Sequence, residues 1–197
     1  MDASRGMQGP LVPDGEGPPG VEPFAALPRG ALVTRYAGGS SQLPSGVLDL
    51  DDEALDTFFR PEAGVGLWSC RVLLGHLADA ETAYVHRLRR AVAEDGPVVA
   101  PWDEDAFIDR GLYGSAGSSP TLKPGGFVAV VHTLRLWTAE WLASLDDAGW
   151  DRKMLHPERG EQTVGDVVVY ATYHLERHAW FLRRKLERLG AMSEGAG

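Results

Sequence analysis

The last long helical pattern in the chain, residues 163–190, carries two histidines on its apolar face. Thr163 followed by Asp166 predicts an N-terminal capping box, and Gly190 predicts the C-terminal end of the helix. The residues that recur at three- and four-residue spacing form its predicted core stripe: Val164, Val167, Ala171, His174, His178 and Leu182. Two imidazoles therefore stand where a buried stripe favours leucine or alanine.

Burying two imidazole rings without partners costs free energy, so the fold must provide something that satisfies them. Four residues of helix separate His174 from His178 by about 6 Å along one face. This spacing lets both rings reach a single metal ion. A third ligand from another helix would complete such a site.

Residues 69–94 predict a second long helix, with Ser69 as its N-cap and a Gly-Pro pair beyond its end. The apolar stripe of this helix contains one histidine and consists of Val72, Leu73, His76, Leu77, Ala80, Ala83 and Tyr84. Because apolar stripes face one another in a bundle, we predict that His76, His174 and His178 converge on one divalent ion such as Zn²⁺, Ni²⁺ or Fe²⁺. Three protein ligands leave positions open for water or substrate, as in a catalytic site. The alternative is three hydrogen-bonded core histidines without a metal.

The remaining patterns indicate an all-α fold. Residues 31–36 predict the start of a first helix, 51–59 a short helix and 127–145 a third strong helix. Residues 97–126 form a long connection with a short helix near 103–108, and 146–162 are expected to form a loop, with no convincing strand. The predicted core side of the third strong helix consists of Phe127, Val130, Val131, Leu134, Trp137, Trp141 and Leu145. Together these patterns predict an antiparallel four-helix bundle with a long crossover loop.

Length and composition limit the class of protein. A chain of 197 residues fits one domain. We expect residues 1–27, dense in Gly and Pro, to be a disordered tail, 28–190 to be the bundle and 191–197 to be a flexible C-terminal tail. The formal net charge of −9 argues against a general nucleic-acid binder, and no apolar run approaches the ~20 residues of a membrane span. One cysteine and no apolar leader segment predict a cytoplasmic protein.

The positions of several other residues suggest roles for them at or near the site. Asp79, one turn after His76, is a candidate to orient a ligand or hold a metal-bound water, and a solvent-facing or ion-paired acid is the equal alternative. Glu81 is expected to pair with Arg135 across helices. Cys70 is interpreted as a packed residue rather than a nucleophile, although a helix start can lower a thiol pKa. Trp102 would form a wall of the site if the long loop folds over it.

The remaining histidines are assigned structural or surface positions. His86 stands beside three arginines and is expected at the surface. His132 lies off the main stripe of its helix. His156 precedes a proline in a loop, which favours a role in a turn over that of a fourth ligand.

Two segments resemble the DinB/YfiT-like family of metal-dependent enzymes. The first consists of Trp68-Ser69 with residues 74–81, LGHLADAE, and the second of His156-Pro157, Gly160, Thr163 and the His174/His178 pair. This resemblance covers roughly residues 27–189. It implies a four-helix bundle with a three-histidine site for a divalent metal, often assembled as a homodimer. Some members transfer a low-molecular-weight thiol such as bacillithiol, and related proteins are mycothiol-dependent isomerases.

The resemblance and the residues together lead to one functional hypothesis with open alternatives. The expected function is metal-dependent activation of a low-molecular-weight thiol for S-transfer to a small-molecule substrate. The alternatives are a metal-dependent hydrolase, a thiol-dependent isomerase, and a non-catalytic metal-binding protein of stress response or protein interaction. No residue other than the three histidines is carried over as a site residue, and the catalytic residues are not assigned.

Overall fold

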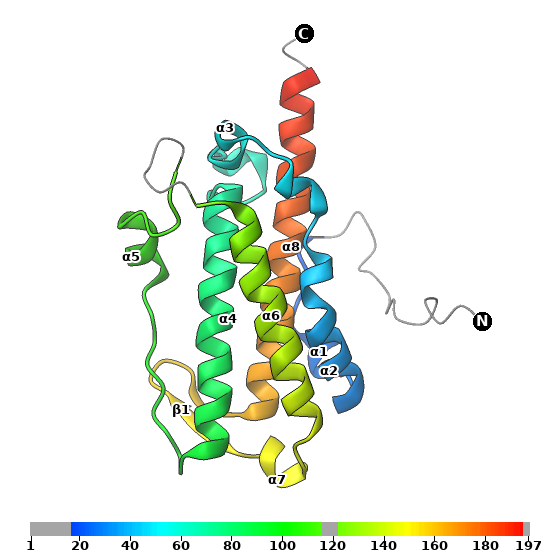
Figure 1. Ribbon diagram of the computed structural model, residues 1–197, viewed down its shortest axis with the longest axis vertical. Helices are drawn as coiled ribbons and strands as arrows, with labels where there is room; N and C mark the ends of the chain where they lie inside the picture. Colours follow the sequence, from blue (N-terminus) through cyan, green and yellow to red (C-terminus); the bar gives the residue numbers. More distant parts are fainter. Residues whose placement is uncertain (1–16, 116–121, 195–197) are drawn as a thin grey trace, which may run out of the picture.

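Four helices form the bundle: α2 (Arg29–Ala37), α4 (Cys70–Ala93), α6 (Pro124–Ala143) and α8 (Val164–Glu194). The structure is a computed structural model, and it describes residues 17–115 and 122–194. Helices α2 and α4 each pack against both α6 and α8. Figure 1 shows that α4 and α6 run in one direction and α2 and α8 in the other. The predicted four-helix bundle with a long crossover is therefore confirmed, with the crossover joining two parallel neighbours.

Short elements connect the bundle helices. Helix α1 (Glu22–Ala25) precedes α2, and the 3-10 turns Gly38–Gln42, Ser45–Leu48 and Pro61–Ala63 lie with α3 (Asp52–Leu55) between α2 and α4. The crossover contains α5 (Glu104–Asp109), as predicted, and α7 (Asp147–Trp150) follows α6. Within the described ranges, no helix is long and apolar enough to cross a membrane.

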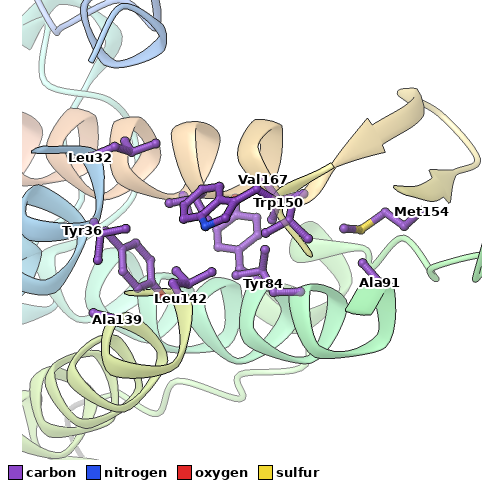
Figure 2. Close-up of a cluster of buried hydrophobic side chains, with 14 of the residues drawn as sticks. Leu32, Tyr36, Tyr84, Ala91, Ala139, Leu142, Trp150, Met154 and Val167 are labelled. Carbon is purple, nitrogen blue, oxygen red and sulfur yellow. The ribbon is translucent and has the colours of Figure 1, made fainter. Parts of the chain in front are cut away.

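The core lies between the bundle helices and continues to their lower end. Figure 2 shows Tyr36, Tyr84, Leu142 and Trp150 gathered with Val167 in one cluster of buried side chains. A second buried cluster lies toward the opposite end of α4 and α8, around Leu73, Leu77, Leu175 and Leu182. Of the histidines described below, His76 and His178 lie among the residues of this second cluster in sequence, and His174 lies between Ala171 of the first cluster and Leu175 of the second.

Several predicted boundaries need correction. The segment 146–162 is not a plain loop, because β1 (Lys153–His156) and β2 (Gly160–Thr163) form an antiparallel hairpin in register Lys153↔Thr163. Gly160 closes its turn at φ 76°, a left-handed conformation that suits glycine. The helix predicted at 51–59 is limited to Asp52–Leu55, and α8 continues past Gly190 to Glu194.

The ends of the domain differ from the predicted boundaries or lie outside the described residues. The expected tail 1–27 falls partly within the undescribed residues 1–16, but its described part includes α1, where Phe24 is 1% exposed. Its ring meets that of Tyr173 edge-on at 6.0 Å. Ordered structure therefore begins before residue 28. Of the expected tail 191–197, the helix includes residues up to Glu194 and the rest is outside the described residues.

Helix α6 presents a different side to the core from the one predicted. Val130 and Trp137 are 41% and 48% exposed, although both were assigned to the core. The residues that α6 buries are Pro124, Val131, Arg135, Thr138, Ala139 and Leu142. The buried side of α6 is therefore rotated by about one residue from the predicted side. It contains an arginine and a threonine, which a stripe defined by apolar residues leaves out.

Candidate metal centre

The structure brings the three predicted histidines together between α4 and α8. The Nε2 atom of His174 lies 3.1 Å from Nε2 of His76 and 3.1 Å from Nε2 of His178. All three candidate ligand atoms lie within 4.8 Å of one another. Two helices thus direct three nitrogen donors at one point, as the periodicity predicted.

The local sequence explains how α4 and α8 hold these side chains. Ser69 caps α4 by accepting a hydrogen bond from the backbone N–H of Val72 at 3.3 Å. Thr163 and Asp166 form the predicted capping box: the N–H of Thr163 donates to the Asp166 carboxylate at 2.8 Å, and the N–H of Asp166 donates to Thr163 Oγ1 at 3.1 Å. These caps fix the helix starts, and uninterrupted helix carries each histidine to the site.

Electrostatics keep all three imidazoles neutral at pH 7. Burial lowers the pKa of His76 to about 4 and that of His178 to about 3. Burial, followed by the proximity of His178 and His76, lowers the pKa of His174 well below its usual value. A neutral imidazole presents a lone pair, which a metal ligand requires. Within the described residues, Nδ1 of His76 and of His178 has no hydrogen-bond partner. The donor set therefore fits a borderline divalent ion such as Zn²⁺, Ni²⁺ or Fe²⁺.

Aromatic rings surround the histidines. Trp102, from the crossover, stacks on His76 with ring centroids 5.4 Å apart and planes 20° apart. Trp68 lies 4.9 Å from His76 and stacks on His178 at 6.3 Å. On the other side, Tyr170 stacks on His174 at 6.0 Å. The part of the crossover around Trp102 thus folds over the site, which is the condition under which Trp102 was predicted to form a wall, and the histidines lie in a mostly apolar setting.

The three histidines are not equally buried. His76 is 5% exposed, whereas His174 and His178 are only partly buried. Three nitrogen donors with no fourth protein ligand among the described residues are typical of catalytic rather than structural metal sites.

Asp79 lies beside the site and near Tyr113, which sequence reasoning missed. Asp79 is partly buried, and burial raises the pKa of its carboxyl group. Tyr113 is 3% exposed, and its hydroxyl has no partner of full hydrogen-bond geometry, yet it is close enough for the Asp79 charge to help raise its pKa. The Tyr113 ring fills the space over Gly75, where a Cβ would lie 2.3 Å from Tyr113 Cδ1. No local pattern signals this contact, because it depends on the path of the crossover.

The other candidate residues have structural or surface positions. Cys70 is fully buried, and burial raises its thiol pKa to about 11. His86 is exposed, as expected. His132, also exposed, hydrogen-bonds Ser40 Oγ at 2.9 Å. His156 is buried in the hairpin, where its Nδ1 accepts a hydrogen bond from the Glu158 N–H at 3.3 Å, which suits the predicted turn role.

Glu81 and Arg135 form the predicted pair across α4 and α6, 2.7 Å apart and almost fully buried. The same guanidinium donates at 2.6 Å to the carbonyl of Ala171, which lies three residues before His174. This pair therefore supports the helix that carries two of the three candidate ligands.

Comparison with known proteins places this arrangement in a family. The chain is 28% identical over 136 residues to a protein of Oceanobacillus iheyensis, covering 69% of this chain and 73% of the relative. It is 28% identical over 152 residues to YfiT of Bacillus subtilis, covering 76% and 79%. Both relatives bear the name "Putative metal-dependent hydrolase".

Two solved structures share the fold. YfiT of Bacillus subtilis, described as having an unusual four-helix bundle topology, superposes with a TM-score of 0.70 at 23% identity over 82% of this chain and 87% of that one. A mycothiol-dependent maleylpyruvate isomerase superposes with a TM-score of 0.58 at 19% identity, over 81% of this chain but only 62% of the isomerase. The model of the DinB superfamily matches residues 25–182, which include all three histidines, and the chain belongs to this superfamily.

Proposed function

We propose that this protein is a metal-dependent enzyme that uses a low-molecular-weight thiol as nucleophile toward a small electrophilic substrate. His76, His174 and His178 would hold one divalent ion. The observation that carries the proposal is the convergence of three neutral Nε2 donors within 4.8 Å at a place where two of the rings are partly exposed. The non-catalytic alternative, a purely structural site, would be closed by a fourth protein ligand.

A bound divalent ion would supply Lewis acidity, lowering the pKa of a thiol or water that coordinates it. The thiol has to come from a separate molecule. Cys70 is the only cysteine in the chain, it is fully buried, and burial raises its pKa to about 11. A protein thiolate is therefore not available at neutral pH. The shared fold with a mycothiol-dependent isomerase supports this choice of nucleophile.

The chain's own residues would position and shield the reactants. The rings of Trp68 and Trp102 lie against His76, with centroids at 4.9 and 5.4 Å, and shield that side of the site from water. Asp79, whose pKa burial raises, lies one turn from His76 on α4 and is a candidate to accept or return a proton. Either S-transfer or a thiol-dependent isomerisation is compatible with this arrangement.

A hydrolase is the second candidate. The names of the relatives favour it, and an ion held by three protein ligands has positions that can take water as well as a thiol. The two candidates share the histidine site and differ in the nucleophile, so assays of product separate them.

The test begins with metal content, measured by mass spectrometry on tag-free protein purified without chelator and after reconstitution. We expect about one equivalent of metal in the wild type and loss of it in His76→Ala and His174→Ala. His86→Ala is the matched control, because it removes an exposed histidine from the same helix, α4. Circular dichroism checks that each variant stays helical.

The reconstituted protein is then incubated with a generic electrophile and bacillithiol, mycothiol or glutathione, and separately with an activated ester. Thiol conjugation that disappears in His174→Ala but persists in His86→Ala would support the transferase. Ester cleavage without thiol, lost in the same variant, would support the hydrolase instead. Wild-type protein that holds no metal after reconstitution would refute both.

A further inference from the structure

Two arginines lie beside the histidine cluster without a carboxylate partner. Arg87 is on α4, and Arg159 is in the turn between β1 and β2. Among the described residues neither forms an ion pair, whereas Arg90 pairs with Glu94 and Arg135 with Glu81. Arg177, next to His178, also forms no ion pair among these residues, but its Nη1 lies 3.5 Å from the Pro19 carbonyl and its Cζ 5.6 Å from the centre of the Phe181 ring. Arg87 and Arg159 are thus two guanidinium groups near the site that lack an ion-pair partner.

Arg159 reaches the site through Tyr170. Its Cζ lies 4.3 Å from the centre of the Tyr170 ring, and its Nη2 lies 3.3 Å from the Tyr170 hydroxyl. That ring in turn stacks on His174 at 6.0 Å, with planes 24° apart. The guanidinium of Arg159, in an exposed turn, is thereby linked through the Tyr170 ring to His174, a candidate metal ligand.

Arg87 approaches the same place from α4. Its Nη2 donates to the carbonyl of Ala100 at 2.8 Å, which anchors the guanidinium against the crossover. Tyr84, one turn earlier on α4, meets the His174 ring at 5.7 Å and the Tyr170 ring at 6.1 Å. Arg159 thus lies against Tyr170, Arg87 lies one helical turn after Tyr84, and both tyrosine rings lie within 6.0 Å of the His174 ring.

Two guanidinium groups at one edge repel each other unless an anion lies between them. Burial and the charge of Arg159 lower the pKa of Arg87, and both arginines help to lower the pKa of the buried His156. Glu158 acts on Arg87 in the opposite sense, but its side chain is exposed and forms no ion pair among the described residues. An oxyanion would relieve this repulsion, and guanidinium groups bind carboxylates with paired, charge-assisted hydrogen bonds.

We propose that Arg87 and Arg159 bind the carboxylate of an acidic small-molecule substrate and orient its reactive part toward the site at His174. This inference deepens the proposed function. That the bound carboxylate belongs to a substrate rests on that proposed function. The same chemistry would attract inorganic phosphate, so the source of the oxyanion is a question for the test. The tyrosine pair offers an apolar surface for the body of the molecule next to its charged end.

The test is an NMR titration of the full chain with phenylacetate, its neutral isostere phenylacetamide and inorganic phosphate, each at millimolar concentration. We expect phenylacetate to bind the wild type and phenylacetamide to bind about tenfold or more weakly, because the amide lacks the charge. Arg87→Gln and Arg159→Gln should each weaken phenylacetate about tenfold. The matched control Arg89→Gln, whose guanidinium lies over Trp137 on α6, should leave binding unchanged.

Each titration is repeated on chelator-treated protein, because a carboxylate that binds only to a metal ion would then lose its affinity. Binding of phenylacetate that survives chelation and depends on both arginines supports the proposal, even if the wild type holds no metal. The absence of metal would refute the proposed function but not the carboxylate site. Equal binding of phenylacetate and phenylacetamide, or no effect of either arginine, overturns the proposal while leaving the metal site intact. Phosphate binding tighter than that of phenylacetate, with the same dependence on both arginines, overturns the assignment to a carboxylate.

Discussion

Arg135 is the residue through which all four bundle helices are joined. From α6 it pairs with Glu81 on α4 and donates to the backbone carbonyls of Tyr36 on α2, at 3.1 Å, and Ala171 on α8, at 2.6 Å. The Tyr36 hydroxyl also donates to Glu81, and burial raises the pKa of that hydroxyl. The buried charge of Arg135 is tolerated because each nitrogen of its guanidinium group donates a hydrogen bond.

Removing one partner of this buried pair should therefore be costly. We expect Glu81→Ala to lower the free energy of unfolding by about 3–5 kcal/mol, because it leaves the Arg135 charge buried and uncompensated. Glu94→Ala is the matched control at the C-terminal end of the same helix, since its pair with Arg90 lies at the surface and should contribute little to stability. Urea unfolding monitored by circular dichroism measures both. Equal losses in the two variants would contradict a special role for the Glu81 pair.

Lys185 is a second buried cation, and it has no carboxylate partner among the described residues. It is 1% exposed, its Nζ donates to the carbonyl of Gly66 at 2.9 Å, and the Phe59 ring lies 4.6 Å away. Burial lowers its pKa from 10.5 to about 8, an effect that nearby Cys70 opposes. The folded protein thus releases the proton at lower pH than the unfolded chain does.

This shift predicts how stability depends on pH. Between about pH 8 and 10.5 the unfolded chain binds more protons, so the free energy of unfolding contributed by Lys185 rises with pH, and the full penalty applies below pH 8. Cys70 acts in the opposite direction only above about pH 9, since burial raises its pKa to about 11. We therefore expect Lys185→Met to be more stable than the wild type at pH 7, with the difference shrinking by about 1 kcal/mol by pH 9.

Urea unfolding at pH 7, 8 and 9 measures this difference. Lys153→Met provides the control, because Lys153 is exposed and its pair with Glu161 lies at the surface. A constant difference between Lys185→Met and the wild type across this range would show that Lys185 does not titrate there.

At the scale of elements, the sequence predicted helices well where a stripe was long and capped. The capping residues Ser69 and Thr163 were identified correctly, and most residues of the predicted α4 and α8 stripes are buried, whereas Ala83, His174 and His178 are only partly buried. Helix α6 is apolar on more than one side, so periodicity alone did not select the side that contains Arg135. The hairpin was missed because its alternation, with Met154 and His156 buried, extends over only four residues.

The crossover's position depends on a glycine of α4. Gly75 leaves room for the Tyr113 ring, and we expect Gly75→Ala to displace this tyrosine because the new Cβ would lie 2.3 Å from its ring. The variant should be destabilised by about 1–3 kcal/mol, the usual cost of overpacking. Gly190→Ala is the matched control inside α8, where no atom lies within 4 Å, and it should gain about 0.5–1 kcal/mol. Thermal unfolding compares them, and a stabilised Gly75→Ala would refute the contact.

At the scale of the whole molecule, the candidate site combines residues that periodicity reveals with residues that it does not. His76, His174 and His178 could be brought together from the sequence because regular helices position all three. Trp102 was anticipated only on the condition that the crossover folds over the site. Arg87, Arg159 and Tyr113 were not anticipated, because their positions depend on the crossover and the hairpin, whose paths no repeating pattern specifies.

The outer side of α6 bears an apolar stripe that is partly exposed. Val130 and Trp137 are 41% and 48% exposed, and Leu134 and Trp141 lie on the same side at helical spacing. Arg89 from α4 lies over Trp137 at 4.5 Å and covers part of this stripe. A contiguous apolar stripe on one helix suits an isologous contact with a second copy, in which the same residues meet across a two-fold axis. The expected homodimer would use this face.

Sedimentation velocity of the full chain tests this expectation. We expect the wild type to sediment as a dimer at micromolar concentration and Trp137→Glu to sediment as a monomer, because each interface would then bury two unpaired carboxylates. Leu155→Glu is the matched control, since Leu155 on β1 is 47% exposed and lies away from α6. Circular dichroism should show the same helix content in all three proteins. A monomeric wild type, or a dimer that Trp137→Glu leaves intact, would exclude this face as the dimer interface.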